Sequence, residues 1–160
     1  MLLTEITQQH EIILVCGNLC SGKGHFCQAK YPDFYRIEIS SVVKSLSKAT
    51  DRLDLSQTAY LDIKIIERLI ELISAHNKVI VDGIRQPSIL QALERHYGDQ
   101  IKDVIWLDVP EDIRRKRYEE RASDKDKRQT FDQAMQGDIG LGIDKLEQYI
   151  KQKHRTLPYS

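Results

Sequence analysis

The chain has few of the residues that mark specialised protein classes. Its 160 residues include three cysteines, four prolines and one tryptophan, and 24 basic side chains balance 24 acidic ones. The cysteines Cys16, Cys20 and Cys27 are odd in number and lack zinc-finger spacing, so we expect reduced, semi-buried thiols. The neutral balance argues against a general nucleic-acid coat or a polybasic membrane-binding surface.

Long hydrophobic runs are missing as well. No run approaches the roughly 18 apolar residues that span a bilayer, and the first ten residues carry no basic region followed by an apolar one. We therefore expect a cytoplasmic protein with no membrane partner. The length suits a single domain over residues 1–160.

Short apolar runs alternate with longer helical patterns. Leu61, Ile65, Leu69 and Ile73 recur at the three- and four-residue spacing of an amphipathic helix within 57–76. This order predicts an α/β fold with a parallel sheet and right-handed crossovers. Strands are expected at 11–16, 34–39, 78–83 and 104–109.

Several element ends are also suggested by the sequence. Ser40 or Ser41 could cap a helix that follows the second strand. Glycines are expected to interrupt the segment before a last helix at 143–153, after which no run has the pattern of a strand. The glycines concerned are Gly137, Gly140 and Gly142.

The most specific pattern is a phosphate-binding loop at residues 17–24. It fits G-x-x-x-x-G-K between a buried strand and a helix, which is the context that this motif needs. Backbone N–H groups and the helix N-terminus attract phosphate oxygens, and Lys23 can follow a transferring phosphoryl group. The predicted nucleotide-binding residues are Gly17, Asn18, Cys20, Ser21, Gly22, Lys23, Gly24 and His25.

The end of this motif departs from the usual pattern. Gly24 stands where many such loops carry the Ser or Thr hydroxyl that ligates magnesium. Magnesium would then be held through water and by Asp82, or it would bind weakly. His25 either contacts phosphate or lies on the helix surface, and we favour the surface.

The sequence resembles the P-loop kinases of small phosphorylated substrates, nearest to deoxynucleoside monophosphate kinase-like and dephospho-coenzyme A kinase-like proteins. Three stretches carry the resemblance: the loop at 17–24, Val-Ile-Val-Asp-Gly-Ile-Arg-Gln-Pro at 79–87, and 107–121. The resemblance implies a P-loop NTPase-type three-layer α/β/α fold, with four strands in the order 2-3-1-4. It also implies a small helical lid around 114–130.

The resemblance also suggests roles for residues outside the loop. Asp82 would hold magnesium, Arg85 would grip the acceptor's phosphate, and Arg117 and Arg121 would offset charge on the transferring phosphoryl group. The alternative for Arg85 is a solvated ion pair. The alternative for Arg117 and Arg121 is that they lie on a salt-bridged surface helix. Further acceptor-side candidates are Ser40, Ser41 and Glu38.

The function predicted is ATP- and Mg²⁺-dependent phosphoryl transfer to a small acceptor, foremost a nucleoside or deoxynucleoside monophosphate. A phosphate acceptor needs no general base, whereas a hydroxyl acceptor, as in dephospho-coenzyme A, would need Asp82 or Glu38. Two alternatives are a nucleotide sensor without turnover and a kinase of a polynucleotide or modified base. The balanced charge weakens the last, so small-molecule nucleotides rather than nucleic acid are the expected partners.

Overall fold

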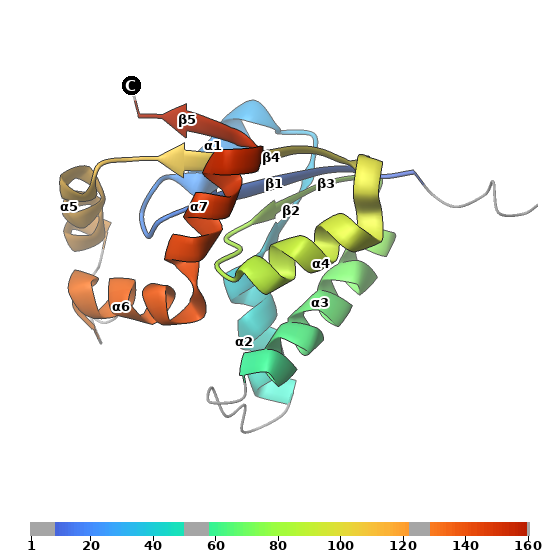
Figure 1. The fold of residues 1–160 in the computed structure, drawn as a ribbon, viewed down its shortest axis with the longest axis horizontal. Helices are drawn as coiled ribbons and strands as arrows, with labels where there is room; N and C mark the ends of the chain where they lie inside the picture. The colour runs from blue at the N-terminus through green and yellow to red at the C-terminus, as the bar shows by residue number, and fades with distance from the viewer. Residues whose placement is uncertain (1–8, 50–57, 122–128, 160) are drawn as a thin grey trace, which may run out of the picture.

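A parallel sheet forms the centre of the molecule (Figure 1). The computed structural model describes residues 9–49, 58–121 and 129–159, and within them the strand order is β2-β3-β1-β4-β5. All four neighbouring pairs run parallel. The strands are β1 (Glu11–Gly17), β2 (Tyr35–Glu38), β3 (Lys78–Asp82), β4 (Ile101–Asp108) and β5 (Arg155–Pro158).

The prediction of four strands is wrong, because a fifth strand follows the last helix. β5 pairs with β4 from Ile105 opposite Arg155 to Asp108 opposite Pro158. This strand is short, and at the edge of a sheet Pro158 withholds no hydrogen bond that a neighbouring strand needs. The first four strands do take the predicted order 2-3-1-4.

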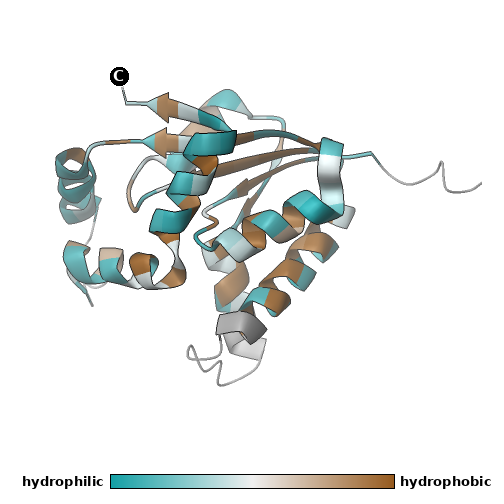
Figure 2. Ribbon diagram, viewed as in Figure 1, coloured by the Kyte–Doolittle hydropathy of each residue, from teal (hydrophilic) through white to brown (hydrophobic). Residues whose placement is uncertain are grey.

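Helices cover the two faces of the sheet unequally. The larger core lies under four helices, where Leu14, Val81 and Trp106 from the strands meet Leu69 and Leu90 from the helices. These helices are α2 (Ile39–Ala49), α3 (Thr58–Ser74), α4 (Pro87–Tyr97) and α7 (Ile143–Lys153). In Figure 2 the central strands are mostly brown, whereas the helices carry both brown and teal residues. On the opposite face, α1 (Lys23–Lys30) packs Cys27 and Phe26 against Val15 and Ile80.

Two further helices lie beyond the carboxyl ends of the strands, α5 (Glu111–Arg121) and α6 (Phe131–Leu141) (Figure 1). A short 3₁₀ turn, η2 (Gly98–Gln100), leads from α4 into β4. Because ligands of open α/β sheets bind at the carboxyl ends of the strands, α5 and α6 stand beside the expected site.

Two expected helix ends are corrected by the structure. α2 begins at Ile39, so Ser40 and Ser41 lie inside its first turn instead of capping it. α6 runs through Gly137 and Gly140 and ends at Leu141, and its C-cap Gly142 has φ +106° and donates its backbone N–H to the Ile139 carbonyl oxygen. Thr130 caps this helix with a reciprocal hydrogen-bond pair to Gln133.

The remaining expectations concern the lid, the cysteines and the membrane. The segment 122–128 of the predicted lid lies outside the described residues. The three cysteines are free, as predicted, and they are buried, whereas we expected semi-buried thiols. In the described part of the chain, the helices are too short or too polar to cross a membrane.

Candidate functional site

The loop after β1 takes the conformation of an anion cradle. Gly22, with φ +86°, precedes α1, and no side chain caps that helix or places an acid in its first turn. The N–H groups of a helix's first turn have no partners within the helix, so those of α1 are available to phosphate oxygens. Gly17 allows a close approach, since a Cβ there would lie 3.1 Å from the Leu107 carbonyl oxygen.

Lys23 folds back over this loop. Its Nζ donates to the carbonyl oxygens of Gly17 and Asn18, both at 3.2 Å, and to Ser21 Oγ at 3.5 Å. Burial lowers the pKa of Lys23, while the charge of Asp82 works in the opposite direction. These weak neutral contacts can be exchanged for phosphate oxygens, which bind an ammonium group more strongly.

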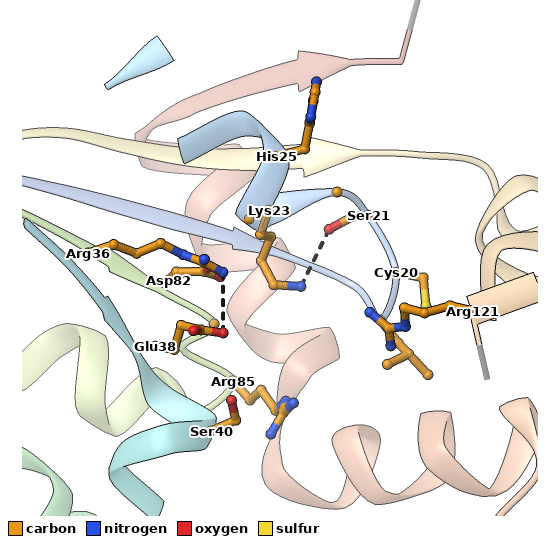
Figure 3. Close-up of a pocket in the computed structure, with 14 residues that line it drawn as sticks. Cys20, Ser21, Lys23, His25, Arg36, Glu38, Ser40, Asp82, Arg85 and Arg121 are labelled. Atoms are coloured by element: carbon orange, nitrogen blue, oxygen red, sulfur yellow. Dashed lines mark hydrogen bonds and ion pairs between the residues drawn. The ribbon is translucent and has the colours of Figure 1, made fainter. Parts of the chain in front are cut away.

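A cavity of about 460 Å³ opens in front of the loop. Figure 3 shows Arg36, Asp82 and Glu38 on one side, Cys20 and Arg121 on the other, and Lys23 between them. Polar side chains from β2, the end of β3, α1 and α5 therefore converge on one space. The other lining residues are Leu19, Ser21, Gly22, Gly24, His25, Ser40, Gly83 and Arg85.

Most of the predicted site residues line this cavity, and a few do not. Gly17 and Asn18 do not line it, although their carbonyl oxygens accept hydrogen bonds from Lys23, and Ser41 is exposed outside the cavity. Arg117 borders a neighbouring cavity and donates from Nη1 to the Cys20 carbonyl oxygen at 3.2 Å. His25 borders both cavities and points away from Lys23 in Figure 3.

Comparison with known proteins places the chain in a family. The model of the AAA domain family matches residues 13–137, more than three quarters of the chain. The chain belongs to the AAA domain family. A search of the curated proteins found no match to this AAA domain.

Solved structures share the fold of this AAA domain. Shikimate kinase from Bacteroides thetaiotaomicron superimposes with a TM-score of 0.64 at 13% identity, over 92% of this chain and 85% of that one. Shikimate kinase from Acinetobacter baumannii, solved in complex with shikimate, has a TM-score of 0.58 at 17% identity, over 99% of this chain and 88% of that one. TT1252 from Thermus thermophilus has a TM-score of 0.53 at 13% identity, over 96% of this chain and 90% of that one. The fold is thus that of P-loop small-molecule kinases.

Arg85 and Arg114 have protein partners in this AAA domain. Arg85, which lines the cavity, has its Nε 3.0 Å from Oδ1 of Asp138 on α6. Burial raises the pKa of Asp138, although the charges of Arg85 and Lys23 act against that rise. Arg114 is buried and donates to the Val109 carbonyl oxygen at 2.9 Å, which suits a structural role.

Sequence reasoning missed Arg36. Its Nη2 and Nε lie 2.6 and 2.9 Å from Oδ2 of Asp82, and its Nη2 lies 3.2 Å from Oε2 of Glu38. Burial works against the charge of Arg36, but the hydrogen bond and charge of Asp82 raise its pKa above the ordinary arginine value. The available signal was alternation, which places residues 36 and 38 of a strand on the same face.

The residues present do not fit a magnesium ion in this arrangement. Magnesium is held by carboxylates and waters in near-octahedral geometry, but Arg36 engages both carboxylates that line the cavity, Asp82 and Glu38. Position 24 offers no hydroxyl. Nor does any group of three acidic, histidine or cysteine side chains with metal-binding geometry occur in the described ranges.

Proposed function

We propose that the protein is an ATP-dependent phosphotransferase whose acceptor is a small phosphorylated molecule, foremost a nucleoside or deoxynucleoside monophosphate. One observation carries this proposal. The cradle formed by the loop and the start of α1 shares one cavity with Arg85 and Arg121, which are cations suited to a second phosphate group. Positioning and electrostatics supply most of the acceleration in phosphoryl transfer.

The donor triphosphate would lie along the loop, with its transferring end at Lys23. The neighbouring cavity, of about 840 Å³, shares Ser21, Gly22 and His25 with the first. It is lined by Phe26, Leu107, Leu157, Pro158 and Tyr159, and the Arg117 guanidinium lies 5.6 Å from the Tyr159 ring centroid. This aromatic and apolar groove suits a nucleobase.

Arg85 would hold the acceptor. Its guanidinium can bind two phosphate oxygens side by side, and its pairing with Asp138 fixes its position beside the cavity. An acceptor phosphate is already ionised at neutral pH, so the reaction needs no general base. Arg121 and Lys23 would offset the charge of the phosphoryl group in transit.

A hydroxyl acceptor is the second candidate, because two of the similar structures are shikimate kinases. Such an acceptor needs a carboxylate or another base within hydrogen-bond reach of its proton. The two carboxylates of the cavity, Asp82 and Glu38, are both engaged in ion pairs with Arg36, so that neither is left unpaired for the hydroxyl of an acceptor. The geometry therefore favours a phosphate acceptor.

The sensor alternative has lost the support of an absent last strand. A missing last strand would have left the nucleobase side incomplete, but β5 supplies Leu157 and Pro158 to the groove. The absence of a hydroxyl at Gly24 remains.

The test is an assay of ADP formation by the purified chain with ATP, magnesium and each common ribo- and deoxyribonucleoside monophosphate. Parallel reactions contain shikimate, dephospho-coenzyme A or an oligonucleotide. We expect turnover with at least one monophosphate and its loss in Lys23→Ala. Turnover confined to a hydroxyl acceptor or an oligonucleotide would replace the proposed acceptor class, and tight ATP binding without turnover would favour the sensor.

A further inference from the structure

Arg36 reaches the phosphate-binding side of the sheet because of strand register. β2 lies at the edge, and β3 pairs with it so that Arg36 is opposite Ile80 and Glu38 opposite Asp82. Ile80 packs in the smaller core, on the face that α1 covers. Alternation therefore places Arg36, Glu38 and Asp82 on the face from which α1 begins.

The guanidinium lies where it neutralises the acidic end of the cavity. Its contacts with Asp82 and Glu38 use Nε and Nη2. A guanidinium carries five N–H donors, so those of Nη1 remain for a phosphate oxygen. A divalent cation bound by the same carboxylates would instead meet this positive charge at close range, which is unfavourable.

The absence of a side chain at Gly24 makes room for the Arg36 guanidinium. A Cβ built at this position would lie 2.7 Å from Arg36 Nη2 and 3.3 Å from its Cζ. The backbone of Gly24 is not in the left-handed region, so its conformation does not require glycine. The missing hydroxyl at position 24 and the position of the Arg36 guanidinium are therefore linked, because a side chain at position 24 would displace Arg36.

The charges that line the cavity fit a metal-free ligand. Four cationic side chains, Lys23, Arg36, Arg85 and Arg121, face two carboxylates, Asp82 and Glu38, and Arg85 is also paired with Asp138 on α6. This leaves an excess of positive charge toward a polyphosphate without any bound ion. Because Asp82 and Glu38 hold the guanidinium in place, it is preorganised for an incoming anion.

We propose that Arg36 takes the place of the divalent cation, so that the site binds a nucleoside triphosphate as the free anion. This inference rests on the proposed function, because it takes the cradle at 17–24 to be a triphosphate site. It adds a phosphate-binding residue outside the loop, and it states which form of the nucleotide is bound.

Calorimetric titration of ATP into the full chain tests this inference, in EDTA and in excess Mg²⁺. For the wild type we expect tighter binding in EDTA, because excess Mg²⁺ complexes most of the ATP and leaves little of the free anion. Arg36→Ala should weaken binding in EDTA by about tenfold or more, the effect of losing one charge-assisted phosphate contact. The control is Arg115→Ala, which removes a half-buried arginine that lies outside both cavities and pairs with Glu111 and Asp132, and it should leave both values unchanged.

A second pair of variants tests the exchange between guanidinium and hydroxyl. Gly24→Ser alone should weaken binding in both buffers, because its side chain meets Arg36. Combined with Arg36→Ala, it should restore binding in Mg²⁺ and leave it weak in EDTA. Restored binding that is equally strong in EDTA would contradict the proposed exchange.

The outcomes separate this inference from the proposed function. Wild-type binding that is as tight in Mg²⁺ as in EDTA, or tighter, would overturn the role of Arg36 and leave the phosphotransferase standing. No binding in either buffer would overturn both. The wild-type comparison decides the question even if a variant fails to fold.

Discussion

Nε of Arg85 lies 3.0 Å from Oδ1 of Asp138, which connects the segment after β3 to helix α6. Asp138 is buried, and Arg85 is half-buried at the wall of the cavity. An acceptor's phosphate would therefore meet an arginine already fixed in position, and α6 would contribute to acceptor binding through this pair.

Arg85→Ala should raise the KM for the acceptor by about tenfold or more while the KM for ATP changes little. The expected size follows from the roughly 1.5–3 kcal/mol of a hydrogen bond to a charged group. Initial rates with each substrate varied in turn measure both constants. Arg115→Ala serves as the control.

The substitution also leaves Asp138 without its partner, so folding must be checked separately. Arg85→Ala combined with Asp138→Asn removes the unpaired carboxylate. It should show the same rise in the acceptor KM. An equal rise in both KM values would contradict the assignment of Arg85 to the acceptor.

Asp138→Asn should stabilise the protein at neutral pH. Burial raises the pKa of Asp138 in the folded state, so the folded protein binds this proton more tightly than the unfolded chain does. The stability linked to this group is present below its unfolded pKa and is lost as the pH rises through its folded pKa. The asparagine side chain does not ionise, so the variant does not lose this stability as the pH rises.

Thermal unfolding from about pH 3 to pH 7 measures this effect. The melting temperature of Asp138→Asn should exceed that of the wild type at neutral pH, and the difference should shrink toward the acidic end. A variant less stable than the wild type at pH 7 would show that the ion pair with Arg85 outweighs the cost of burial.

Gly137 and Gly142 should respond in opposite ways to alanine. Gly137 lies inside α6, and no atom lies within 4 Å of the place that a methyl group would take, so alanine should stabilise by about 0.5–1 kcal/mol. Gly142 has φ +106°, and a Cβ there would lie 3.0 Å from Pro87 Cδ, so alanine should destabilise by about 1 kcal/mol or more. Urea denaturation of both variants checks the signs. Stabilisation by both substitutions would contradict the helix end at Gly142.

The parts of the fold that depend on local pattern were predictable. The apolar runs that became β1 and β3, and the loop 17–24 between β1 and its helix, are visible in consecutive residues. β5 was missed because it has four residues of mixed polarity and forms only by pairing with β4. The prediction that Gly137 and Gly140 interrupt a helix failed because the capping box at Thr130 and surrounding contacts outweigh their propensities.

The site was predictable in its loop and less so in its pairings. Lys23 and Asp82 follow from motifs, but the contact between Asp82 and Arg36 depends on which strand neighbours β3 and in what register. The pairing of Arg85 with Asp138 likewise depends on where α6 packs. The remaining roles assigned to the arginines and to Ser40, Ser41 and Glu38 stay predictions.

The central claim is that the loop at 17–24 holds a triphosphate with Lys23 at its end. Calorimetric titration of ATP into the wild type, Lys23→Met and Lys145→Ala tests it most directly, with circular dichroism to verify folding. Lys145 is an exposed lysine on α7 outside both cavities, so its loss is a matched change of charge. We expect binding by the wild type and Lys145→Ala, and a loss of about tenfold or more in Lys23→Met. Equal ATP binding by all three folded proteins would contradict the account.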